Sequence, residues 1–282
     1  MEPLVCTVGD LVRDVVVHTA QPMVRHADVP AHITAHRGGS AANTAAAVVH
    51  AGGRARFVGC VGVDDDGMHL LTELANAGVD CVGARRGRTG VVVVVVEPDG
   101  ERTMFSDRGD SSALDLFEPA WLDDVAVLHV PAYAFVTQPL ARTAESMLAA
   151  ARERGILCSV DPSSVTMIDD RLRDLLVRVQ PDVLLCNREE AAALGVDDDG
   201  WGTVRYVVVK QGPAPVLLRG AVSADIPTLV LDGPIDATGA GDAFAAGFLL
   251  SLARGASPLD AARNGHEIAS KVVRGAGADA WV

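Results

Sequence analysis

Residues 236–250 read Asp-Ala-Thr-Gly-Ala-Gly-Asp-Ala-Phe-Ala-Ala-Gly-Phe-Leu-Leu, a glycine-rich turn that runs directly into an apolar helix. The free amides of such a turn and helix start form a concave, electropositive nest that suits a phosphate. Asp242 at the junction is the wrong group for binding that phosphate, because like charges repel. It is the right group for taking a proton from an alcohol that attacks the phosphate. The stretch therefore indicates phosphoryl transfer to a hydroxyl; a plain turn with an N-cap Asp is the simpler alternative.

A second motif lies near the N-terminus, where residues 37–44 read Arg-Gly-Gly-Ser-Ala-Ala-Asn-Thr and lead into an Ala- and Val-rich run. Gly38 and Gly39 allow backbone to approach a ligand closely. Ser40 is predicted to cap a helix, and Asn43, about one turn later, is predicted to point back toward the helix mouth. Two independent glycine-rich motifs carry more weight than either would alone.

Length and composition fit one sizeable α/β unit. The 282 residues are 49% hydrophobic, which is enough for a large core, and the net charge of −13 argues against a nucleic-acid partner. Five widely spaced cysteines, with no Cys-x-x-Cys pair, favour a reduced, cytoplasmic protein. The first apolar run follows no basic segment, and the longest aliphatic run, Val91–Val96, is far shorter than a membrane span. We therefore expect neither a secretion signal nor a membrane partner.

Short apolar runs alternate with helical patterns along the chain. Strands are predicted at Leu4–Val8, Ala55–Cys60, Val125–Val130, Ile156–Val160, Val183–Cys186 and Val204–Val209. Helices are predicted at Ala41–His50, Gly67–Ala77, Pro139–Arg154, Asp169–Val179, Asp242–Leu252 and Pro258–Val273. This alternation indicates an α/β fold whose mostly parallel sheet is covered on both faces.

Two segments break the alternation and read as extra strands. They are Val12–His18 with Ile33–Ala35, and Gly90–Glu97 with Arg102–Ser106. Pro98-Asp99-Gly100 joins the second pair and is a strong hairpin signal. Alternatively, the six consecutive valines form an ordinary core strand.

Together, the motifs at residues 37–44 and 236–244 resemble the N-terminal and C-terminal signatures of the PfkB (ribokinase-like) family of carbohydrate and nucleoside kinases. Their order and separation also fit that family. The resemblance implies a single ribokinase-like domain over residues 1–282, a three-layer sandwich with a mostly parallel central sheet and a small β-strand lid. The lid strands would be inserted at about residues 12–36 and 90–107. Lids of this kind often pair, so a homodimer through the lid is among the expectations.

The resemblance also assigns the chemistry at the C-terminal motif. Asp242 would be the catalytic base, beside the hydroxyl that is phosphorylated. The amides of Ala240, Gly241 and Asp242 would hold the charge that develops on the transferred phosphoryl group. Gly239 belongs to the same turn and, with Thr238, would flank the nucleotide.

At the substrate end the resemblance implies Gly38, Gly39 and Asn43, together with Asp14 or Asp10. Family spacing favours Asp14 as the sugar contact, and leaves Asp10 as a turn or N-cap residue; this alternative stays open. Arg108 resembles a family element at the mouth of the substrate site, with a solvated surface charge as its alternative.

ATP and Mg²⁺ are the implied cofactors. Residues 187–190 read Asn-Arg-Glu-Glu and match the family's Asn-x-x-Glu motif, so Glu190 would orient hydrated Mg²⁺ with help from Asn187. Taken alone, the same pattern is an ordinary helix start. ATP would lie along the loop that contains Lys210 and Gly212, with Asn264 near the adenine and His266 either in the pocket or on the helix surface. In many relatives a monovalent cation such as K⁺ lies behind the anion nest, here near Asp236, and the sequence leaves that open.

The chain departs from the family pattern at residues 195–203, where relatives have a longer helix, and we expect one flank of the sheet to be exposed there. Pro213 and Pro215 stand where another glycine is usual, which makes the choice of nucleotide harder to predict. No Gly-x-x-x-x-Gly-Lys-Ser/Thr motif is present, which excludes an ordinary P-loop kinase.

The sequence thus predicts an ATP- and Mg²⁺-dependent kinase that phosphorylates a hydroxyl, by expectation a primary one, of a small sugar. One alternative is a nucleoside kinase, for which Phe105 is the lid aromatic on offer. Another is a catalytically silent sugar- or nucleotide-binding protein on the same fold. The scarcity of Tyr and Trp favours a sugar over a nucleoside, because a purine pocket needs aromatic surfaces for stacking.

Overall fold

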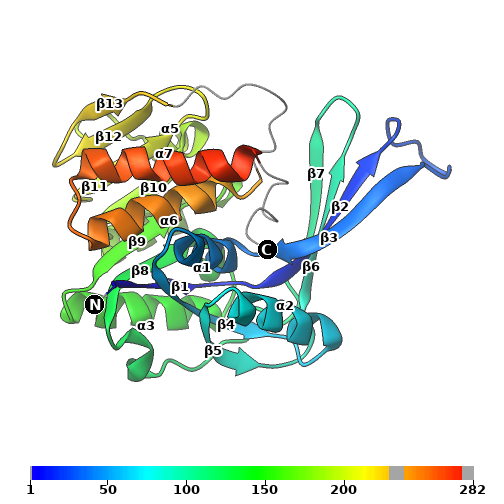
Figure 1. Ribbon diagram of the computed structural model, residues 1–282, viewed down its shortest axis with the longest axis horizontal. Helices are drawn as coiled ribbons and strands as arrows, with labels where there is room; N and C mark the ends of the chain where they lie inside the picture. Colours follow the sequence, from blue (N-terminus) through cyan, green and yellow to red (C-terminus); the bar gives the residue numbers. More distant parts are fainter. Residues whose placement is uncertain (1, 229–237, 275–282) are drawn as a thin grey trace.

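A nine-stranded sheet forms the centre of the molecule (Figure 1). The computed structural model describes residues 2–228 and 238–274. In spatial order the strands are β13 (Ala224–Ile226), β12 (Val216–Gly220), β11 (Tyr206–Lys210), β10 (Val183–Asn187), β9 (Leu157–Asp161), β8 (Val125–Pro131), β1 (Leu4–Val8), β4 (Arg54–Val61) and β5 (Asp80–Arg85). All neighbours from β11 to β5 run parallel, whereas β12 and β13 are antiparallel additions at one edge.

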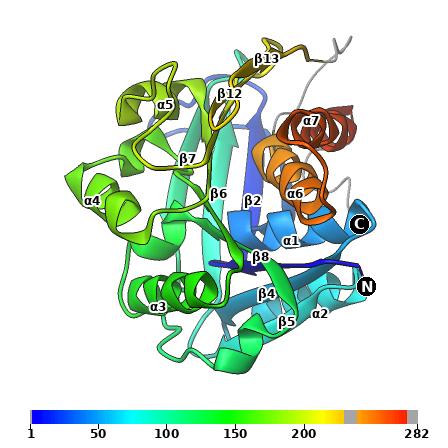
Figure 2. The same cartoon turned by 90° about the vertical axis from the view of Figure 1, so that its left-hand side faces the viewer.

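Helices cover both faces of this sheet (Figure 2). One layer contains α1 (Ser40–His50), α2 (Asp65–Asn76), α6 (Ala240–Ala253) and α7 (Pro258–Arg274). The other contains α3 (Leu140–Glu153), α4 (Asp170–Val179) and α5 (Arg188–Leu194). Three short 3-10 helices, η1 (Pro119–Leu122), η2 (Ala132–Phe135) and η3 (Val165–Met167), lie in the connections. The fold is therefore the three-layer α/β sandwich that the sequence predicted.

Two large hydrophobic clusters, one on each side of the central sheet, form its core, and a small third cluster lies in the four-stranded sheet. Successive strand residues alternate between the two large clusters, as Val127 and Leu128 do: Val127 packs with α1 and α6, and Leu128 with α3 and α4. Both side chains are fully buried. Burial on both faces explains why the parallel strands read as unbroken apolar runs rather than as alternating ones.

A separate four-stranded sheet stands beside the central one, at the right of Figure 1. Its order is β3 (Ala31–Gly38), β2 (Val12–Thr19), β6 (Gly90–Val96) and β7 (Arg102–Asp107). β2 and β6 run parallel, and the outer pairs are antiparallel. The six valines lie in β6 of this small sheet, so the predicted extra strands are confirmed and the alternative of an ordinary core strand was wrong.

Three strands were not predicted from the sequence, and the expectation for residues 195–203 was wrong. β5, β12 and β13 were missed because their apolar runs are short or interrupted; β5 and β13 are the two edges of the sheet, and β5 contains Gly83. The expectation of an exposed sheet flank near residues 195–203 was wrong. Val207 and Val209 of β11 remain buried, and Trp201 packs beneath the turn while its Nε1 donates a hydrogen bond of 3.0 Å to the Leu194 carbonyl.

Within the described ranges, no helix combines the length and the apolar character that crossing a membrane requires.

Candidate active site

A cavity of about 750 Å³ lies between the small sheet and one edge of the central sheet. Asp161, Asn187 and Lys210 line it and are the last residues of β9, β10 and β11, so the cavity opens at the carboxyl ends of the parallel strands. This is the edge where open α/β sheets place their ligands. The small sheet contributes Val12, Asp14, Val92, Met104 and Ser106, which makes it a lid over the cavity.

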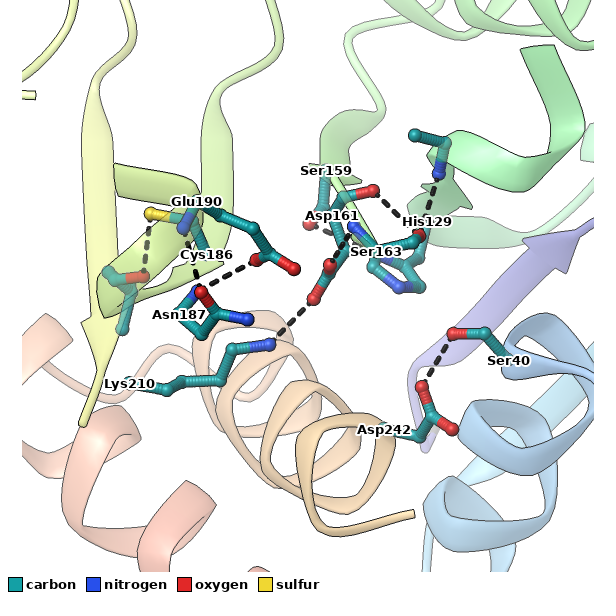
Figure 3. A network of polar contacts seen from close by, with 12 residues as sticks. Ser40, His129, Ser159, Asp161, Ser163, Cys186, Asn187, Glu190, Lys210 and Asp242 are labelled. Atoms are coloured by element: carbon teal, nitrogen blue, oxygen red, sulfur yellow. Dashed lines mark hydrogen bonds and ion pairs between the residues drawn. The ribbon is translucent and has the colours of Figure 1, made fainter. Parts of the chain in front are cut away.

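Asp242 lies in the first turn of α6 and faces this cavity. Ser40 Oγ donates a hydrogen bond of 2.5 Å to Asp242 Oδ1 (Figure 3), and Asn43 Nδ2 lies 3.4 Å from Oδ2. Burial raises the pKa of Asp242 to about 6, although the bond from Ser40 acts in the opposite direction. The carboxylate is thus held in place with a pKa close to neutral, as a proton acceptor requires.

Ser40 was predicted as a helix cap, and that assignment was wrong. The N-cap of α1 is Gly39, with φ of 100°, and Ser40 is the first helical residue. A side chain placed on Gly39 would meet the Asp10 carbonyl oxygen at 2.2 Å. Only glycine fits at this position between α1 and the segment that follows β1. Because Gly39 takes the N-cap position, the Ser40 hydroxyl does not cap the helix and donates to Asp242 instead.

The start of α6 offers backbone amides to the same cavity. The first helical backbone bond recorded there runs from the Ala243 amide to the Gly239 carbonyl at 2.9 Å, and Gly239 has φ of 75°. The amides of Ala240, Gly241 and Asp242 precede that bond and have no partner inside the helix. All four residues from Gly239 to Asp242 line the cavity, so the predicted anion nest and the base share one wall.

A second carboxylate, Asp14 of β2, lines the cavity from the lid. Burial first, and the charge of Asp242 second, raise the pKa of Asp14 to about 7. Gly38 lies beneath this carboxylate, since a Cβ there would come within 2.1 Å of Asp14 Oδ1. Gly38 does not line the cavity itself; it makes room for the side chain that does.

Asp10 lies outside the cavity lining, just behind it. Its side chain is 4% exposed and forms an ion pair with Arg108, whose guanidinium also stacks over the Tyr133 ring at 4.2 Å. Arg108 and Tyr133 do line the cavity. The pairing of Asp10 with Arg108 was not foreseen, because the two residues are 98 positions apart in the chain.

Lys210 and Asp161 form an ion pair of 2.7 Å at the strand ends (Figure 3). The Ser163 amide donates a bond of 2.7 Å to the other Asp161 oxygen. Burial disfavours the charged ammonium, but the attraction of Asp161 and Glu190 outweighs this and raises the pKa of Lys210. Asp161, Ser163 and Tyr133 were missed, although Asp161 directly follows a predicted strand and could have been found by that position.

Asn187 and Glu190 form a reciprocal capping box at the start of α5. The Glu190 amide donates to Asn187 Oδ1, and the Asn187 amide donates to Glu190 Oε2, both at 2.8 Å. Both side chains also line the cavity, and burial raises the pKa of Glu190 to about 7. The motif is therefore a helix start that also presents a carboxylate to the site. In the described ranges no three His, Cys, Asp or Glu side chains lie together as direct ligands of a metal ion.

The far end of the cavity is lined by Gly212, Thr238, Phe244 and His266. His266 meets the edge of the Phe244 ring at 5.5 Å, and its Nε2 is buried without a hydrogen-bond partner in the described part of the chain. Arg102 of β7 donates a bond of 3.1 Å to Thr238 Oγ1 and so connects the lid with the glycine-rich turn.

Asn264 does not line the cavity, and its Nδ2 donates a bond of 3.0 Å to Ser251 Oγ. A role for it near the adenine therefore stays a prediction. Asp236, named for the monovalent cation, lies outside the described residues.

Comparisons with known proteins agree with this picture. The chain matches the pfkB family of carbohydrate kinases over residues 2–281. It is 37% identical to a fructokinase from Klebsiella pneumoniae over 239 residues, which are 77% of this chain and 76% of that protein. It is 33% identical to an ATP-dependent ribose-1-phosphate kinase from Halopiger xanaduensis over 238 residues, 79% of this chain and 76% of that one.

Solved structures share the fold. The adenosine kinase from Sinorhizobium meliloti superposes with a TM-score of 0.86 at 23% identity, over 99% of this chain and 96% of that chain. The ribokinase from Thermotoga maritima gives a TM-score of 0.81 at 24% identity, with the same coverage. The ribokinase-like architecture is thus confirmed, and the chain belongs to the pfkB family of carbohydrate kinases.

Proposed function

We propose that this protein transfers the terminal phosphoryl group of ATP to a hydroxyl, by expectation a primary one, of a small sugar. The observation that carries the proposal is the shared position of Asp242 and the α6 amides in one helical turn facing the cavity. A base for the hydroxyl and a cradle for the phosphoryl charge then lie within a few ångströms of one reaction centre.

Asp242 accepts the proton of the attacking hydroxyl. With a pKa of about 6 it is mainly ionised at neutral pH, yet it remains basic enough to share a proton in the transition state. Ser40 and Asn43 hold its two oxygens, so little reorganisation is needed when the sugar binds. Asp14 and Arg108 offer an acceptor and a donor to the remaining hydroxyls from the lid side.

The residues at the phosphate end fit ATP and a hydrated Mg²⁺. The amides of Ala240, Gly241 and Asp242 point toward the position of developing negative charge, and preorganised donors of this kind contribute about 10²–10³-fold to a rate. Lys210 adds a positive charge to the same wall, 3.5 Å from where a side chain on Gly241 would begin. Magnesium keeps most of its waters and needs few carboxylates, so Glu190 with Asn187 beside it suffices to orient the ion. When bound, the magnesium ion would neutralise phosphate charge, and ATP would supply the phosphoryl group.

A nucleoside acceptor is the runner-up, and the lid gives it little support. Phe105, the expected aromatic clamp, is 57% exposed and does not line the cavity, whereas its neighbour Met104 does. Tyr133 lines the cavity, but Arg108 already covers one face of its ring.

We also propose two features that the sequence left open, activation by K⁺ and a homodimer formed through the lid. Exposed Ile33 and Phe105 on the small sheet support the dimer. Sedimentation with and without a double Ile33→Ser, Phe105→Ser change tests it, and turnover in K⁺ against Na⁺ tests the cation.

The decisive experiment measures ATP consumption with Mg²⁺ and K⁺ across pentoses, hexoses, sugar acids, sugar phosphates and nucleosides. Asp242→Asn is the control, and we expect it to lower turnover by about 10²–10⁴-fold while ATP and sugar still raise the melting temperature. A substrate-dependent signal that the variant loses establishes the kinase. Silence with every acceptor, together with intact ligand binding, would instead make the chain a silent binding protein.

A further inference from the structure

The ion pair between Asp10 and Arg108 determines the net charge at the end of the cavity where the sugar is proposed to bind. Among the described residues, Arg108 is the cationic side chain that lines this end, and its side chain is 34% exposed, so it is open to a ligand. Asp10 is almost fully buried behind Arg108. Its Oδ2 accepts a hydrogen bond from Arg108 Nη1, so the carboxylate balances the positive charge of the guanidinium. The centre of the guanidinium lies 4.2 Å from the centroid of the Tyr133 ring, and Asp10 accepts from Nη1, one of the three guanidinium nitrogens.

The backbone of Asp10 is packed tightly against the start of α1. Gly39 packs directly on the Asp10 backbone, where even a Cβ would come within 2.2 Å of the carbonyl oxygen. Its Oδ1 is buried without a hydrogen-bond partner among the described residues, so the ion pair is the main interaction that compensates the buried charge. An anionic ligand that drew Arg108 away would leave the buried Asp10 carboxylate without a partner, at the full free-energy cost of its desolvation.

The rest of the cavity adds negative charge near the acceptor. Its described lining carries four carboxylates, those of Asp14, Asp161, Glu190 and Asp242, against the cations of Arg108 and Lys210. Lys210 is paired with Asp161 and lies at the phosphate end. Once Arg108 is neutralised by Asp10, the charge of Asp242, together with that of Asp14 in its ionised fraction, leaves the sugar end with an excess of negative charge.

We propose that the Asp10–Arg108 pair restricts the acceptor to uncharged polyols and excludes sugar phosphates and sugar acids. The inference rests on the proposed kinase function and narrows its substrate class. Arg108 acts as a hydrogen-bond donor to a hydroxyl rather than as a receptor for an anion, and Asp10 is the specificity-determining residue behind it. The two curated relatives differ on this point, since one is named for fructose and the other for ribose 1-phosphate.

The first test compares neutral and anionic acceptors on the unchanged protein. We expect kcat/KM for ribose and fructose to exceed that for ribose 1-phosphate, fructose 1-phosphate and a sugar acid by at least about tenfold. Higher efficiency with a phosphorylated or carboxylated acceptor would overturn the inference and leave the kinase function intact. Absence of turnover with every acceptor would refute the proposed function itself.

The second test changes the charge of the pair with little change in shape. Asp10→Asn frees the Arg108 charge, so the ratio of anionic to neutral kcat/KM should rise by about 10–100-fold. Asp10→Glu keeps the charge and should keep the preference for neutral acceptors. Asp123→Asn is the matched control, because it removes a carboxylate that pairs with Arg154 on the surface, and its ratio should not change. An unchanged ratio in folded Asp10→Asn would refute the inference.

If Asp10→Asn fails to fold, Arg108→Gln gives an independent answer. We expect this variant to lose efficiency with neutral sugars and to gain none with anionic ones. A selective loss of anionic acceptors would show that Arg108 receives an anion, and the inference would be wrong.

Discussion

Ser40 Oγ donates a 2.5 Å hydrogen bond to Asp242 Oδ1, which joins the starts of two helices that are 202 residues apart in the chain. The bond stabilises the ionised carboxylate and so opposes the effect of burial on the pKa of Asp242. Each glycine-rich motif therefore supplies half of the arrangement, with the base on α6 and its hydroxyl partner on α1.

Ser40→Ala should shift the acidic limb of the kcat/KM profile to higher pH. Asp242 accepts a proton only when ionised, so activity should rise with pH through a pKa of about 6. Loss of the hydroxyl removes an interaction that lowers this pKa, and we expect the limb to move upward by about 0.5–1 pH unit. A pH–rate profile from pH 5 to 8 measures the shift; an unchanged or lower limb would contradict the role of Ser40.

Glu190→Gln should stabilise the apo protein at pH 8 and weaken its use of Mg²⁺. Burial raises the pKa of Glu190 to about 7, so its neutral form is favoured in the folded protein. That contribution to stability is present below the unfolded pKa, near 4.5, and is lost as the pH rises through about 7. Gln keeps the capping box without the charge, and should add about 1–2 kcal/mol at pH 8 and little at pH 4.

Thermal unfolding at the two pH values and Mg²⁺ titration of turnover check these expectations. Glu189→Gln, at the neighbouring position outside the cavity lining, is the matched control for a lost charge. Equal Mg²⁺ dependence in Glu190→Gln and the unchanged protein would remove Glu190 from the metal site.

Lys210→Met should destabilise the fold because it leaves Asp161 as an unpaired, nearly buried carboxylate. The side chains of this pair are 16% and 11% exposed. Breaking such a pair from one side costs about 3–5 kcal/mol, and the double variant Lys210→Met, Asp161→Leu should recover much of that loss. Urea unfolding of the single and double variants gives the coupling energy, and additive losses would show that the two residues do not act as a pair.

Gly38→Ala and Gly39→Ala should fail in different ways, although the two glycines are adjacent. The new methyl group at position 38 meets the end of the Asp14 side chain, which can move, so we expect a sugar KM raised by about tenfold with a folded protein. The methyl group at position 39 meets the Asp10 backbone, and its φ of 100° is unfavourable for alanine, so we expect a loss of more than about 2 kcal/mol in stability.

Urea unfolding and sugar KM values separate these two results. Gly212→Ala is a useful comparison, since its φ is 57° but a Cβ there meets no atom within 4 Å. It should show the conformational cost alone, about 1 kcal/mol. Equal stability of all three variants would refute the packing argument.

The sequence by itself determined the layered α/β fold, because buried parallel strands and amphipathic helices have different periods of hydrophobicity. It also determined the anion nest and Asp242, since a glycine-rich turn and the helix that follows are local in the chain. The lid strands could be read for the same reason, from the local alternation and the hairpin signal between β6 and β7.

Only the tertiary structure decided which distant side chains meet. Ser40 was read as a cap but donates to Asp242, Asp10 meets Arg108, and Asp161 meets Lys210. The first contact depends on the packing of α1 against α6, the second on the place of the small sheet beside the end of β1, and the third on β10 lying between β9 and β11. A local pattern fixes the conformation of its own segment, whereas pairing between segments depends on the free energy of the whole packed core, which no single stretch of sequence contains.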